Sequence, residues 1–154
     1  MAHRFRPTLF SALATASGIL GTIASTGPAS AVEVSNLAGL EELFGRYAPG
    51  GDCKRQPQIL VELSGMTFEI PGATLKVTDA EYAASYGPSD YQGISKWFFP
   101  FRITDGYPIL MTFNASEKRG VLLIDPQDEG YKGGPPLSPR NKALVAGSPY
   151  SRCK

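Results

Sequence analysis

The chain has 154 residues, with 15 Lys and Arg against 14 Asp and Glu, and a single histidine, His3. Charges of both signs are scattered along it, so the sequence lacks the basic patch typical of nucleic-acid binding, and we predict no nucleic-acid partner. His3 lies in an N-terminal segment that we predict to be removed. The remaining chain then has no imidazole for a Ser-His or Cys-His pair, or for the usual catalytic zinc sites.

The N-terminal segment has the pattern of a secretory signal peptide. Arg4 and Arg6 precede a small, mostly apolar stretch over residues 9–23, and residues 29–31, Ala-Ser-Ala, resemble a cleavage site. We therefore predict a signal peptide over 1–31 and a secreted or periplasmic protein with no stable membrane insertion after cleavage. The alternative is a retained membrane anchor, which is disfavoured because Ser, Thr and Gly dilute the apolar stretch.

Removal of that segment leaves 154 − 31 = 123 residues, 32–154, which suits a single secreted domain. Its two cysteines are Cys53 and Cys153. In an oxidising compartment the natural prediction is one disulfide that closes a loop of most of the domain. A pair of free or metal-binding thiols is the alternative.

The first predicted element is an amphipathic helix that Ser35 caps. Its apolar residues recur at helical spacing up to Tyr47, and the sequence Ala-Pro-Gly-Gly-Asp-Cys over 48–53 ends it. These apolar positions are Leu37, Leu40, Leu43, Phe44 and Tyr47.

From Gln58 the apolar period changes from helical to two, which predicts three short half-buried strands up to Thr78. A turn at Gly65-Met66 would place Leu63 opposite Phe68 and Val61 opposite Ile70. A turn at Pro71-Gly72, suited to type II, would place Phe68 opposite Leu75. Both turns leave the apolar residues on one face of the sheet.

The rest of the chain predicts a short helix at 80–86, three more strands at about 94–104, 109–113 and 121–124, and a short helix at 139–146. The fold class is therefore α+β and rich in β structure: an antiparallel meander of about six short strands, with helices covering the buried face. One curved sheet, a partly closed barrel and two packed sheets all remain open.

The stretch YQGISKWFFPFR, residues 91–102, holds the densest group of aromatic side chains. With period two, Ser95, Trp97, Phe99, Phe101 and Ile103 share one face, which we predict to be core. The other face carries Lys96, Phe98 and Arg102, and Pro100 places the strand at an edge or a bulge. Tyr91 precedes the strand in a turn rich in Ser, Asp and Gly, a composition typical of recognition surfaces. The candidate ligand-binding residues are therefore Tyr91, Lys96, Phe98 and Arg102. The alternative is that the aromatic residues only pack.

Two carboxylates form a second candidate. In the predicted register Glu62 and Glu69 are directly opposite each other, and like charges in that position destabilise a hairpin unless they are compensated. Lys76, diagonal to Glu69, is a candidate neutraliser. The pair predicts either an acid-base dyad or a hard-cation site, and the alternative is a solvated face with an ion pair. No motif in the sequence indicates a metal or a cofactor. Separately, Asn114-Ala115-Ser116 matches the triplet for N-glycosylation and lies on a predicted turn.

These features favour an exported, small, non-catalytic binding protein of the cell envelope or extracellular space that recognises an unknown protein or glycan. The layout is similar to that of small bacterial envelope proteins, including periplasmic inhibitors of host enzymes, and no signature motif narrows it to one family. Two alternatives remain: a structural or accessory envelope protein without a discrete ligand site, and a carboxylate-dependent enzyme that acts on glycans.

Overall fold

The computed structural model describes residues 32–83, 90–101, 109–127 and 136–154. The predicted signal peptide, Arg102 and the parts of the predicted elements that fall in the gaps lie outside the described residues. Within the described residues ten strands form one sheet, in the order β1-β6-β7-β8-β9-β10-β2-β3-β4-β5, and every neighbouring pair is antiparallel. The prediction of a β-rich antiparallel fold is confirmed, whereas the prediction of about six strands is wrong.

The sheet consists of two meanders and a strand that joins them. The first meander is β2 (Gly45–Pro49), β3 (Gln58–Glu62), β4 (Gly65–Ile70) and β5 (Ala73–Val77). The second is β6 (Glu81–Tyr82), β7 (Lys96–Phe99), β8 (Ile109–Phe113) and β9 (Val121–Pro126), with β1 (Val32–Glu33) paired to its outer edge. The C-terminal strand β10 (Tyr150–Arg152) lies between β9 and β2 and so connects the two meanders.

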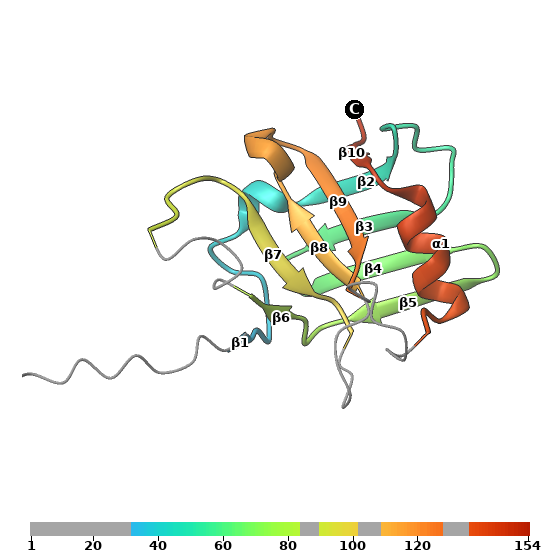
Figure 1. The fold of residues 1–154 in the computed structure, drawn as a ribbon, viewed down its shortest axis with the longest axis horizontal. Helices are drawn as coiled ribbons and strands as arrows, with labels where there is room; N and C mark the ends of the chain where they lie inside the picture. The colour runs from blue at the N-terminus through green and yellow to red at the C-terminus, as the bar shows by residue number, and fades with distance from the viewer. Residues whose placement is uncertain (1–31, 84–89, 102–108, 128–135) are drawn as a thin grey trace, which may run out of the picture.

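The sheet curls into a half-barrel around one core. In Figure 1 strands β7, β8 and β9 cross over β3, β4 and β5, with the helix α1 (Pro139–Gly147) beside them. The largest side chains enclosed between the two halves come from β2, β4, β7, β8 and β10, and they are fully buried. They are Tyr47, Phe68, Phe98, Phe113 and Tyr150.

The predicted C-terminal helix is confirmed. It begins after Ser138, whose hydroxyl accepts a hydrogen bond from the Asn141 N–H at 3.2 Å, and Pro139 occupies the first helical position, where a missing N–H costs nothing. Leu144 is fully buried, and its carbonyl accepts a 2.6 Å bond from the Tyr150 hydroxyl. The helix is thereby anchored to the strand that joins the two meanders.

The predicted N-terminal helix is wrong. Only Glu41–Leu43 forms a single turn of 3₁₀ helix, η1, and Gly45 begins strand β2. Gly45 has φ of +137°, which no α-helix contains, so the helical run ends before it. Leu37, Leu43 and Tyr47 are buried as expected from the pattern, but two successive tight turns, at residues 38–39 and in η1, and the start of β2 deliver them to the core.

The predicted helix at 80–86 is also wrong where the structure describes it, since Glu81–Tyr82 is strand β6 between β1 and β7. Tyr82 is opposite Phe98, with ring centroids 5.2 Å apart, and the Ala83 N–H donates to the Trp97 carbonyl at 2.9 Å. Cross-strand pairing therefore overrides the local helical spacing.

The hairpin register between β3 and β4 differs from the prediction by four residues. Ile59 is opposite Phe68 and Glu62 is opposite Gly65, so the two-residue turn is Leu63-Ser64 and not Gly65-Met66. A shift by an even number keeps every side chain on its predicted face, which is why the apolar pattern alone did not reveal it. The Pro71-Gly72 turn and the pairing of Phe68 with Leu75 are confirmed.

Replacement of Gly65 by alanine is expected to lower the free energy of unfolding by about 2–3 kcal/mol, because strain and steric overlap add. Gly65 has φ of +122°, and a Cβ there would lie 2.1 Å from the Val77 carbonyl oxygen. The control is Gly72→Ala, where φ is +81° but no atom lies within 4 Å, and about 1 kcal/mol is expected. Urea unfolding measures both, and equal losses would contradict the close approach of β4 and β5.

Candidate functional site

Tyr91 and Lys96, two of the predicted ligand-binding residues, lie around the carboxylate of Glu117. The Tyr91 hydroxyl donates to Glu117 Oε1, and it accepts the Ser95 N–H at 2.6 Å. Glu117 Oε2 accepts the Ile94 N–H at 2.8 Å. These bonds lower the pKa of Glu117, with Tyr91 as the largest cause and attraction to Lys96 as the smallest. The carboxylate is thus engaged by groups of the chain itself.

The backbone below this carboxylate is unusual. Asn114, Ser116 and Glu117 have φ of 51°, 54° and 60°, in the left-handed region that side-chain-bearing residues rarely adopt. The Asn114 side chain compensates by donating to the Ile94 carbonyl at 3.1 Å and accepting the Gly120 N–H at 3.0 Å. Asn114 is 1% exposed, so in the folded protein the glycosylation triplet has no accessible amide.

The Glu117 interactions predict a dependence of stability on pH. The folded-state pKa lies below the ordinary value of about 4.3, so the stabilisation is present above that value and is lost as pH falls through the lower, folded-state pKa. Carboxyl NMR titration should show the lowered pKa in the wild type. In Tyr91→Phe, which removes the largest cause, the pKa should return toward the ordinary value; an unchanged pKa would contradict this role of Tyr91.

Phe98 does not meet solvent. Its exposed fraction is 0%, it packs edge-on against Phe113 with centroids 5.7 Å apart, and it belongs to the main core. The prediction that Phe98 is an exposed ring is therefore wrong. Trp97 and Phe99 point to the opposite face, where they form a small second cluster with Ala83 and Leu110.

Other residues thus cover both faces of β7. Because large apolar side chains then occur on both faces, the alternation along the strand does not show which face belongs to the main core. Phe99, on the predicted core face, is buried, but in the second cluster. Pro100 is not in an edge strand; it directly follows β7, which lies between β6 and β8. The Trp97 ring stands edge-on to Tyr91, with centroids 5.0 Å apart.

Glu62 and Glu69 are not opposite each other. In the observed register Glu62 faces Gly65 and Glu69 faces Gln58. The partner of Glu69 is Arg46 on β2, at 2.8 Å between Nη1 and Oε2, in place of the predicted Lys76. The predicted carboxylate dyad is therefore not formed, and the two residues occupy different environments.

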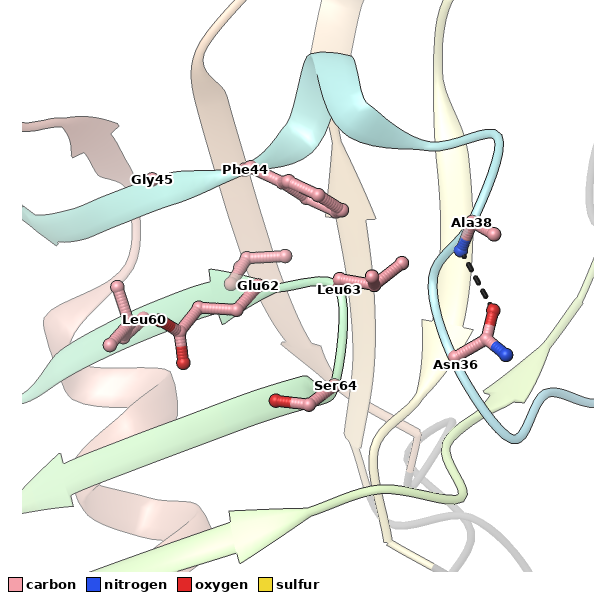
Figure 2. A pocket seen from close by; sticks show the side chains of 9 residues that line it. Asn36, Ala38, Phe44, Gly45, Leu60, Glu62, Leu63 and Ser64 are labelled. Carbon is pink, nitrogen blue, oxygen red and sulfur yellow. Dashed lines mark hydrogen bonds between the residues drawn. The ribbon is translucent and has the colours of Figure 1, made fainter.

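An apolar groove lies beside Glu62. It lies where β2 and β3 diverge: their pairing ends at Gly45 and Val61, and the chain segment before η1 completes the far wall. Figure 2 shows the Phe44 ring on one side, and Leu63 extending toward Ala38 on the other. The groove encloses about 820 Å³ and is lined by Asn36, Ala38, Phe44, Gly45, Leu60, Val61, Glu62, Leu63 and Ser64.

Local contacts hold the groove walls in place. The Leu37 N–H donates to the Leu63 carbonyl at 2.9 Å, which ties residues 36–38 to the β3–β4 turn. The Asn36 side chain accepts the Ala38 N–H at 3.0 Å, as the dashed line in Figure 2 marks. Leu63 remains 53% exposed, one of the few large apolar side chains so placed among the described residues. An exposed leucine at the rim of an apolar hollow is typical of a recognition surface.

Of the groove residues, the sequence identified only Glu62 as a site candidate. The apolar spacing predicts Phe44 on the packed face of a helix, and Leu63 on the buried face of a strand. A shorter β3, ending at Glu62, would have placed Leu63 in the turn, and the polar Ser64-Gly65 that follows was the available signal.

The predicted disulfide is confirmed: Cys53 is bonded to Cys153, with Cα atoms 5.8 Å apart. In the described part of the chain, no helix is long and apolar enough to cross a membrane, and no group of three His, Cys, Asp or Glu side chains is placed so that it could hold a metal ion.

Comparison of the chain with protein-family models, curated proteins and solved structures gives no match.

Proposed function

We propose that this protein is an exported, non-catalytic binding protein that recognises a partner protein through the apolar groove between β2, β3 and residues 36–38. The observation that carries the proposal is the groove itself, with apolar walls and a half-exposed Leu63 at its rim. Export is supported by the signal-like residues 1–31 and by the disulfide, which forms in oxidising compartments.

A protein partner is favoured over a glycan by the chemistry of the walls. Sugar hydroxyls need many hydrogen-bonding partners, and the groove has only three polar side chains: Asn36, Glu62 and Ser64. The Asn36 side-chain oxygen Oδ1 already accepts a hydrogen bond from the Ala38 N–H. Apolar side chains of a protein partner would instead cover Leu63, and burying its exposed half contributes about 1 kcal/mol.

The two alternatives rest on weaker grounds. The glycan-acting enzyme required a pair of opposed carboxylates, and Glu62 and Glu69 do not provide one in the observed register. A purely structural protein has no need of a groove that ends in an exposed leucine, and this alternative makes a different prediction in the following experiment.

Site-specific crosslinking tests the proposal. A photoreactive amino acid is placed at Leu63 or, as the control, at Asp125, an exposed position on β9 that does not line the groove. After incubation with the extracellular or envelope fraction of the source organism, we expect one defined protein adduct from position 63 only. Leu60→Asp in the same chain should reduce its yield. No adduct, or equal adducts from both positions, would favour the structural alternative.

A further inference from the structure

Glu62 is the only ionisable side chain among the residues that line the groove. It is exposed, and Figure 2 shows its carboxylate extending on the side of β3 that carries Leu60. Among the described residues no cation and no hydrogen-bond donor engages this carboxylate. The groove therefore presents one negative charge, beside Leu60 on its β3 wall (Figure 2), that no group of the described residues neutralises.

Arg46, the cation on the adjacent strand, is already committed elsewhere. It is opposite Leu60 in the register, two residues from the position that would face Glu62. Its Nη1 bonds both Glu69 Oε2 and Gln58 Oε1, each at 2.8 Å. Gln58 is in turn held by its own bond to the Cys53 carbonyl at 2.6 Å. This network fixes the guanidinium beside Glu69 and leaves the charge of Glu62 available to a partner.

We infer that the groove selects a segment of the partner protein in which a lysine or arginine adjoins a large apolar side chain, with Glu62 pairing the cation. This inference rests on the proposed function. Lysine and arginine carry long apolar stems below their charge, so the stem can lie along Phe44 and Leu60 while the head reaches Glu62. The adjoining apolar side chain covers Leu63. Partial exclusion of water strengthens the ion pair relative to one on an open surface.

An acidic segment is disfavoured for the same reason, because it would bring a second negative charge beside an uncompensated carboxylate. A wholly apolar segment would cover the walls but would leave Glu62 desolvated without a partner, which costs free energy. Glu62 is thus the residue that determines specificity, while Phe44, Leu60 and Leu63 supply contact area.

Selection from a library of random linear peptides displayed on phage tests the inference. The immobilised proteins are the full mature chain, Glu62→Lys, Glu62→Gln and the matched control Asp125→Lys, which makes the same charge change at an exposed position outside the groove. Because Glu62 is exposed, the variants should fold, and circular dichroism with thermal unfolding confirms this before selection. Synthetic peptides of the enriched sequences are then measured by calorimetry.

We expect the wild type and Asp125→Lys to enrich the same sequences, with Lys or Arg next to a large apolar residue. Glu62→Lys should weaken these peptides by about tenfold or more, and should itself enrich sequences with Asp or Glu in place of the cation. Glu62→Gln should lower the affinity for these peptides. It should also make that affinity less sensitive to added salt, because the ion pair is lost.

The outcomes separate the two proposals. Peptides that bind the wild type, lose binding on Leu60→Asp and show no basic preference would overturn the role of Glu62 and leave the groove as the binding site. Peptides whose binding is indifferent to Leu60→Asp, or no enrichment at all, would overturn the proposed function and the inference with it.

Discussion

Replacement of Cys53 and Cys153 by serine is expected to lower the free energy of unfolding by about 2–5 kcal/mol. The disulfide joins residues 100 positions apart. Cys153 directly follows β10, the three-residue strand that connects the two meanders. Strand β10 is paired on both sides but has only three residues, so the covalent link adds a strong restraint on the end of the chain beside these backbone bonds. The Cys153 N–H also donates to the Arg46 carbonyl at 2.7 Å, extending the β10–β2 pairing.

Urea unfolding with and without reductant measures this effect. The wild type in reductant should unfold at the midpoint of the double serine variant, and the variant itself should not respond to reductant. A wild type whose midpoint is the same with and without reductant would show that strand pairing alone holds β10, and would contradict the stabilising role of the disulfide.

The second large effect is expected from Phe98→Ala, which should cost about 3–5 kcal/mol. The ring is enclosed by Tyr82 and Phe113, and its cross-strand neighbour Met111 is also fully buried. The cost arises from the lost transfer free energy and from the cavity that remains. Chemical denaturation gives the value, with Lys96→Ala, a partly exposed neighbour in the same strand, expected to change stability by about 0.5 kcal/mol or less.

These two variants distinguish the observed face of β7 from the one that alternation predicted. If Phe98 were an exposed ligand contact, its removal would cost no more than that of Lys96. A small effect of Phe98→Ala would therefore contradict the packing of β7 onto β8.

The sequence predicted those elements whose pattern is long enough to be unambiguous. Strands β3, β4 and β5 have a clear period of two, so the strands themselves were predicted, and the specific chemistry of the Pro71-Gly72 turn also gave the register of β4 with β5. The β3–β4 turn has no such chemistry, and the predicted register of that hairpin is wrong by four residues. Ser138 followed by Pro139 fixed the start of the helix. The disulfide followed from there being only two cysteines. In each case a few residues close together, or a single possible pair, specify the structure without information from distant parts of the chain.

Other elements were beyond local patterns. Strands β1, β6 and β10 have two or three residues, too few for a period, and exist because longer neighbours pair with them. The segment before β2 has helical spacing, but a turn at residues 38–39 followed by the 3₁₀ turn η1 delivers the same residues to the core. The apolar groove depends on segments 36–45 and 60–64 meeting in space, and of its lining residues the sequence indicated only Glu62 as a site candidate.

Binding in the groove is tested most directly by amide chemical-shift mapping on the isotope-labelled mature chain, with a peptide from the library selection or the crosslinked partner as the titrant. If the groove is the binding site, the largest shifts fall in segments 36–45 and 60–64, which contain the residues that line it. Shifts centred instead on residues 91–97, around Tyr91 and Lys96, would contradict binding in the groove and would return the site to the Glu117 network.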